Sequence, residues 1–161
     1  MKAQAAIEYA LVAGFVLAIL LPAALIFYNY SNTTGEDVRE GQLFRLGNNI
    51  VDSAELLYYQ GEPARTVLDE TLPTGISNIS IQKDISRNIY QLVFATNFKG
   101  RHSDSVFVSK VNIEGGNFMV FNAQGLQTGG YLNRSAFAAG NKKIVLEAKD
   151  ASPPYVLITF K

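Results

Sequence analysis

The chain has 161 residues, of which 48% are hydrophobic and 17% are charged. Its 14 basic and 14 acidic side chains balance, so it lacks the excess positive charge typical of nucleic-acid binding, and we expect no nucleic-acid partner. It has no cysteine and one histidine, His102, which excludes disulfides, thiol nucleophiles and metal centres built from several such residues; no metal and no cofactor are expected.

The apolar residues are concentrated near the N-terminus. The nineteen residues from Ala10 to Tyr28 carry no charge and no strongly polar side chain. About 20 apolar residues in a helix cross a hydrocarbon layer of roughly 30 Å. The run is longer than the apolar core of a secretory signal peptide, and the bulky residues 26–30 make a poor signal-peptidase site. We therefore predict that residues 4–30 form a membrane-crossing helix.

A second helix is predicted after a polar cluster at residues 31–35, which has the composition of a hinge. Within residues 31–60, apolar side chains recur every three or four positions, as in an amphipathic helix that packs on one face. They are Leu43, Leu46, Ile50, Ala54, Leu57 and Tyr58. Gly61 and Pro63 would end this helix. The pattern leaves open whether the hinge is helical, giving one rod, or melted, giving two helices in series.

Short strands are predicted after Pro63, because runs rich in Val, Ile, Phe, Tyr and Thr alternate with turn residues. The runs are 66–72, 76–82, 88–96, 105–113, 118–122, 142–148 and 155–160. No helical pattern separates them, so the sheet should be mostly antiparallel. Gly115-Gly116 is typical of a hairpin turn, and Gln124 to Asn141 of a long surface loop. The predicted fold class is α+β: a long N-terminal hydrophobic helix followed by a small, antiparallel, β-rich, sandwich-like head at 61–161.

Signals for catalysis are weak. His102 to Ser105 contain the residue types of a catalytic triad, but neighbours on a strand point to opposite sides and cannot converge, so a solvated loop is expected. Glycine motifs that bind phosphate or expose a nucleophilic serine are absent from the sequence. Glu36-Asp37 would favour the start of the second helix, and Glu114 and Asp150 would be solvated turn residues. We predict no enzyme and no catalytic residue.

The sharpest motif is Lys2 to Tyr9, Lys-Ala-Gln-Ala-Ala-Ile-Glu-Tyr, directly before the apolar run. From physical chemistry alone, Glu8 is an acid at the membrane interface, where solvation is available. The segment resembles the class III (prepilin-type) signal of archaeal type IV pilins, in which a peptidase cuts before a Gln-x-Ser-x-Glu-Tyr type sequence. The resemblance implies that residues 1–3 form the leader, that Lys2 and Ala3 precede the cut, and that Gln4 becomes the new N-terminus.

The same resemblance implies a structural subunit that polymerises through its helix into an extracellular adhesive filament, being anchored in the membrane before assembly. Its partners would be copies of itself, the prepilin peptidase, the assembly ATPase and membrane platform, and surfaces or other cells. Assembly would involve Glu8 and Tyr9. Gly14 and Ala18, four residues apart, would allow close helix approach, and Pro22, which lacks a backbone N–H, would kink or locally melt the helix.

Two related functions remain open: an archaellin-like motility filament subunit, and a non-polymeric, membrane-anchored minor pilin or binding protein. An anchored hydrolase would need a convergent polar site that the sequence does not contain. Three sequons, at Asn32, Asn78 and Asn133, are candidates for N-glycosylation, which suits an extracellular head.

Overall fold

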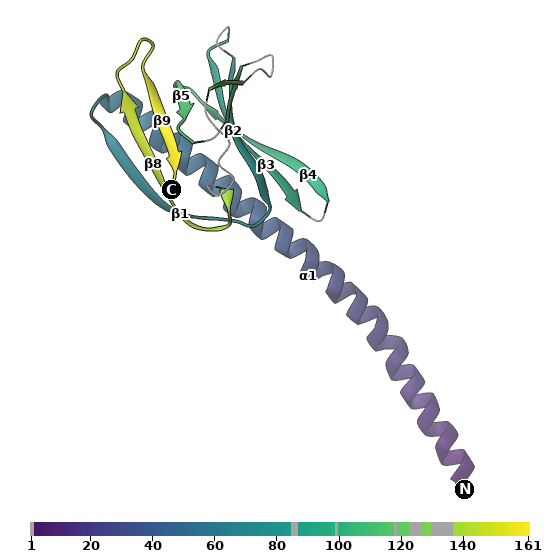
Figure 1. The fold of residues 1–161 in the computed structure, drawn as a ribbon. Helices are drawn as coiled ribbons and strands as arrows, with labels where there is room; N and C mark the ends of the chain where they lie inside the picture. The colour runs from purple at the N-terminus through teal and green to yellow at the C-terminus, as the bar shows by residue number, and fades with distance from the viewer. Residues whose placement is uncertain (1, 85–86, 99, 118, 123–126, 130–136) are drawn as a thin grey trace. The chain divides into compact units, whose positions relative to one another are not determined.

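The computed structural model describes residues 2–84, 87–98, 100–117, 119–122, 127–129 and 137–161; positions 2–6, 32–34, 119, 122 and 127–129 are described by their backbone alone. The chain divides into two compact units, residues 1–38 and 39–161. Helix α1 (Lys2–Gln60) begins in the first unit and ends in the second (Figure 1). The predicted hinge at 31–35 is helical. The helix also continues through Pro22, so of the two effects expected there, a kink or local melting, the melting is wrong and the kink stays a prediction.

Nine strands follow in the described part of the chain: β1 (Arg65–Leu72), β2 (Ile76–Asp84), β3 (Ile89–Phe98), β4 (Arg101–Ser109), β5 (Ile113–Gly115), β6 (Met119–Asn122), β7 (Gln127–Gly129), β8 (Gly140–Lys149) and β9 (Tyr155–Phe160). They form two sheets. Sheet A has the order β1-β8-β9-β5, and sheet B the order β4-β3-β2-β6-β7. Most neighbours are antiparallel, as predicted, but β2–β6 and β5–β9 are parallel. The chain therefore belongs to the α+β class.

The predicted strand 105–113 is interrupted where the chain passes from sheet B to sheet A. The hydroxyl of Ser109 donates to the Val111 carbonyl (2.9 Å) and accepts from the Val111 N–H (3.2 Å). A serine side chain that bonds the backbone two residues on replaces ladder hydrogen bonds and turns the chain. Strand β4 therefore ends at Ser109, and β5 begins at Ile113 in the other sheet.

The predicted hairpin at Gly115-Gly116 is wrong. The strands on its two sides lie in different sheets, with β5 beside β9 and β6 beside β2. The N–H of Gly116 donates to the Ile158 carbonyl (2.8 Å), and Asn117 Oδ1 accepts from the Phe160 N–H (3.0 Å). These bonds keep the segment on sheet A beyond the glycines, so the chain cannot fold back on itself there.

Two expected loops are also partly wrong. His102 to Ser105 lie in β4 rather than in a solvated loop, because the turn is completed at Gly100, whose φ of 82° suits glycine. The region 124–141 includes β7, the first residues of β8 and Phe137, which is only 4% exposed and belongs to the core. Positions 124–126 and 130–136 of that predicted loop lie outside the described residues.

The acidic residues also differ from their expected settings. Glu114 is half-buried in β5 and pairs with Lys83 of β2, so it is not a solvated turn residue. Glu36-Asp37 lie inside α1 and do not open a helix, because the preceding residues are helical. Asp150 follows β8 and is exposed, as predicted.

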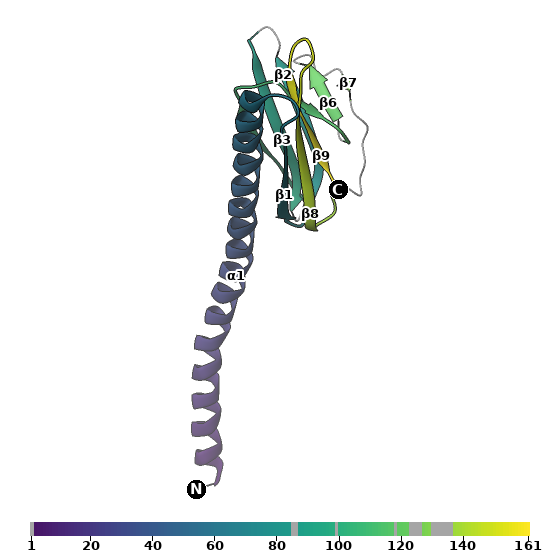
Figure 2. The same cartoon turned by 90° about the vertical axis from the view of Figure 1, so that its left-hand side faces the viewer.

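The core of the second unit lies between the two sheets and the C-terminal part of α1 (Figures 1 and 2). The helix contributes the predicted apolar stripe, with Leu43, Leu46, Ile50, Ala54 and Leu57 buried. Polar contacts connect the helix to one edge strand of each sheet. Asn49 Nδ2 donates to Glu70 Oε1 of β1 in sheet A (2.6 Å), and Glu55 Oε1 accepts from the Lys110 N–H just after β4 of sheet B (3.1 Å). From here on, the head means this whole second unit, residues 39–161, which adds the C-terminal part of α1 to the predicted residues 61–161.

Candidate functional site: the exposed apolar segment

The apolar part of α1 is exposed on all sides. From Ile7 to Ser31 every side chain is exposed except that of Ala13, which is half-buried. The large hydrophobic side chains in this stretch are between 46% and 78% exposed. By length and composition the helix is able to cross a membrane, and the most apolar window has no residue buried. We call Ile7–Ser31 the apolar segment.

Such a surface is unfavourable in water. Burying one large aliphatic or aromatic side chain is worth about 1.5–3 kcal/mol, and the apolar segment carries many of them around its whole circumference. A helix that is apolar all round is normally enclosed by lipid or by protein. A surface of this kind is therefore expected to be covered by lipid or by protein.

Glu8 is the one charged side chain of the apolar segment, and it lies at its N-terminal end, exposed like its neighbour Tyr9. Gly14, Ala18 and Pro22 recur at intervals of four residues, so they lie along one side of the helix. A methyl group built at Gly14 would meet nothing within 4 Å, so this side offers a shallow strip of small residues to an incoming helix. Lys2, Ala3 and Gln4 are helical, and only their backbone is described.

The three sequons lie in different settings. Asn32 is in α1 with only its backbone described, and Asn133 lies outside the described residues. Asn78 is half-buried in β2, its Oδ1 is buried without a hydrogen-bond partner, and Ser80 of the same sequon is 6% exposed. Modification of all three asparagines stays a prediction.

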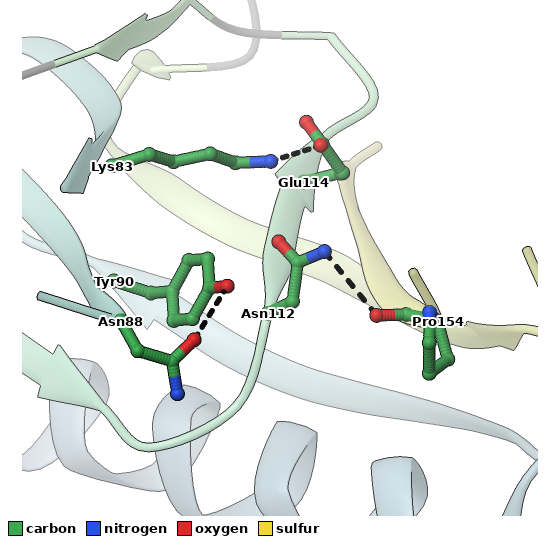
Figure 3. Close-up of polar contacts among 6 residues, drawn as sticks. All are labelled: Lys83, Asn88, Tyr90, Asn112, Glu114 and Pro154. Carbon is green, nitrogen blue, oxygen red and sulfur yellow. Dashed lines mark hydrogen bonds and ion pairs between the residues drawn. The ribbon is translucent and has the colours of Figure 1, made fainter. Parts of the chain in front are cut away.

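The head contains a group of polar contacts where the two sheets meet (Figure 3). Lys83 of β2, 11% exposed, pairs with Glu114 of β5 and so links sheet B to sheet A. The Tyr90 hydroxyl donates to Asn88 Oδ1 (3.0 Å). Burial, with smaller contributions from the charges of Tyr58 and Glu114, raises the pKa of the Tyr90 hydroxyl. The Lys83–Glu114 pair therefore joins the two sheets, while the Tyr90–Asn88 bond is local to the start of β3.

His102 and Asp104 occupy exposed positions of β4. Among the described residues, no group of three or more His, Asp or Glu side chains is placed to hold a metal ion.

A cleft of about 330 Å³ lies in the head between the end of α1 and the segment that joins β8 to β9. Tyr58, Glu62, Asp150 and Tyr155 are among the residues that line it. The cleft could not be predicted from local sequence, because it joins segments about 90 positions apart and no local motif marks either of them.

No protein-family model, curated protein or solved structure matches this chain.

Proposed function

We propose that the protein is a structural subunit of an archaeal type IV pilus, which polymerises through the apolar segment into an adhesive filament at the cell surface. The observation that carries the proposal is the combination of an apolar segment exposed on all sides with a head that does not need it. Every residue of the described hydrophobic core lies between Leu43 and Phe160. The described core of the head therefore contains no side chain of the apolar segment.

Lipid and other copies of the chain are the two coverings that suit such a surface. In the membrane, the segment has the length and composition of a span. In a filament, apolar segments of neighbouring subunits would pack together, and the strip of Gly14, Ala18 and Pro22 would allow close approach. A contact between two different surfaces of the same subunit that does not close a ring generates a helical fibre, which is the geometry the proposal requires.

The N-terminal motif favours the filament over a permanent anchor. Glu8 would lie among apolar neighbours in a filament core, where an unpaired charge costs several kcal/mol. The resemblance to archaeal pilins supplies a partner, the free amino group that cleavage creates at Gln4 of an adjacent subunit. The pair would form only when a new subunit docks in register, which ties processing to assembly.

We also propose that the two sheets of the head form a sandwich-like domain. With the helices at the centre, two sheets that close over one end of α1 would form the outer surface of the filament and carry its contacts to surfaces or other cells. Prepilin peptidase, the assembly ATPase and the membrane platform would act on the subunit before and during this step, while the apolar segment holds it in the membrane.

The test is Glu8→Gln, which keeps the shape of the side chain and removes its charge. In cells that lack the wild-type subunit, we expect this variant to reach the membrane with a folded head and to form few or no filaments. Asp37→Asn is the matched control, because Asp37 is an exposed acid of the same helix outside the apolar segment. Normal filament number and length from Glu8→Gln would contradict the assembly role of Glu8 and leave it as an interfacial acid.

A further inference from the structure

We propose that the cleft at the end of α1 binds a cationic amine, that is, a protonated or quaternary ammonium group. The inference concerns the head alone and does not depend on filament assembly. The cleft has a volume of about 330 Å³, at the lower end of the range of small-molecule sites. This volume suits a single amine-bearing group rather than a large cofactor.

Hydrogen bonds hold the walls of the cleft in place. Glu62 Oε2 accepts from the Asp150 N–H (3.0 Å), which joins the segment after α1 to the segment after β8. Asn112, only 9% exposed, donates from Nδ2 to the Pro154 carbonyl (3.2 Å; Figure 3). The Gly61 N–H donates to the Leu57 carbonyl (3.1 Å) and closes the last turn of the helix. The cleft is therefore preformed.

The electrostatic setting of the cleft is negative. The C-terminal end of a helix carries a partial negative charge, and the last turn of α1 has no basic residue to balance it. The acidic residues Glu62 and Asp150 are among those that line the cleft beside this end, and Glu62 Oε2 accepts from the Asp150 N–H. Lys149 is the one basic residue of the lining, against two acidic ones, and its Nζ pairs at 3.2 Å with Oε2 of Glu147, a carboxylate that Arg65 also contacts. The site therefore has an excess of negative charge.

The aromatic lining selects an organic cation. Tyr58 and Tyr155 both contribute to the cleft and are half-buried, and tyrosine rings attract ammonium groups through their negative faces. A bare divalent metal would find too few ligands, because the cleft offers two carboxylates, one of which already accepts a backbone hydrogen bond. A neutral ligand would leave the negative charge unbalanced. An amine would pair with the carboxylates and would also make cation–π contacts with the tyrosine rings.

The experiment is calorimetric titration of choline chloride, and separately of methylammonium chloride, into the full chain held in a non-ionic detergent. Sodium chloride at the same ionic strength measures the non-specific background. We expect saturable binding of at least one ammonium salt to the wild type. We expect the affinity of Asp150→Asn for that salt to be at least fivefold lower. Asp104→Asn, which removes an exposed acid on β4, should bind within twofold of the wild type.

Asp150 is suited to this test, because its side chain is exposed and the structural bond to Glu62 comes from its backbone N–H. Circular dichroism checks that the variant remains folded. Tyr155→Leu provides a second arm and should weaken the binding of choline, whose quaternary ammonium group would contact the tyrosine ring. The inference is overturned if neither ammonium salt gives saturable heat, if Asp150→Asn and wild type bind alike, or if calcium chloride binds more tightly than both amines.

Discussion

A methyl group at Gly47 should destabilise the head, although replacing glycine by alanine inside a helix normally stabilises it by about 1 kcal/mol. Gly47 is buried on the face of α1 that packs on β4, and a Cβ there would overlap the ring of Phe107. That ring is 4% exposed and contacts Phe94 at 5.8 Å and Phe44 at 5.7 Å between ring centroids. Phe94 is fully buried, so the ring of Phe107 cannot retreat inward.

Overpacking a filled core costs about 1–3 kcal/mol, which exceeds the gain in helix propensity. We expect Gly47→Ala to lower the free energy of unfolding by about 1 kcal/mol, equivalent to about 4 °C in melting temperature for a head of this size. The assay is thermal unfolding of the full chain in a non-ionic detergent, followed by near-ultraviolet circular dichroism of the tyrosines.

Gly41→Ala is the matched control. It lies on the same helix, is exposed, and a Cβ there would meet nothing within 4 Å, so this change should stabilise the head by up to about 1 kcal/mol. In a Phe107→Leu background the clash at Gly47 disappears, and Gly47→Ala should become neutral or stabilising. The reasoning is refuted if Gly47→Ala is as stable as Gly41→Ala in the wild-type background.

Three further predictions concern processing, folding and pH. The mature protein should begin at Gln4, and the intact mass of purified filaments checks this; retention of residues 1–3 would exclude the cut. A fragment of residues 34–161 should be soluble, monomeric and folded by circular dichroism, because the described core lies within it; an insoluble or disordered fragment would contradict that division of the chain. Since burial raises the pKa of Tyr90 above 10.0, the folded state keeps this proton to higher pH than the unfolded state, and stability should fall as pH rises through the raised pKa. Tyr90→Phe should therefore lose less stability than wild type in urea titrations between about pH 10 and pH 12; equal losses would refute it.

The sequence predicted those parts of the fold that local pattern determines. The stripe from Leu43 to Leu57 is spaced every three or four residues, and it is buried in the structure. The alternation in Ile89 to Phe94 likewise corresponds to strand β3, with Leu92 and Phe94 fully buried. Local spacing is sufficient for these elements, because each needs only one apolar face and a period of 3.6 or 2 residues.

The pairing between strands could not be predicted from local spacing. Residues 105–113 form one apolar run, yet the side chain of Ser109 divides it and sends its two parts to different sheets. Gly115-Gly116 has the composition of a hairpin, yet its backbone and the following Asn117 bind β9, which lies about 40 positions later. Such contacts depend on which distant strand is available, and a window of neighbouring residues does not contain that information.

The candidate sites also differ in whether local sequence is sufficient to predict them. The apolar segment was predictable because it is a continuous property of nineteen residues. The cleft at the end of α1 was not, because Glu62 and Asp150 meet only through the folding of sheet A. Glu114 was expected in solvent for the same reason, since its partner Lys83 lies 31 positions earlier in the other sheet.

The most direct test of the proposed function is negative-stain electron microscopy of material sheared from the surface of cells that express this chain, with mass spectrometry to identify the subunit. The proposal predicts thin filaments built mainly from this chain, and their absence when its gene is deleted. If the chain is instead recovered only from the membrane, as isolated copies with no filament in the sheared fraction, the protein is an anchored subunit and the filament proposal is wrong.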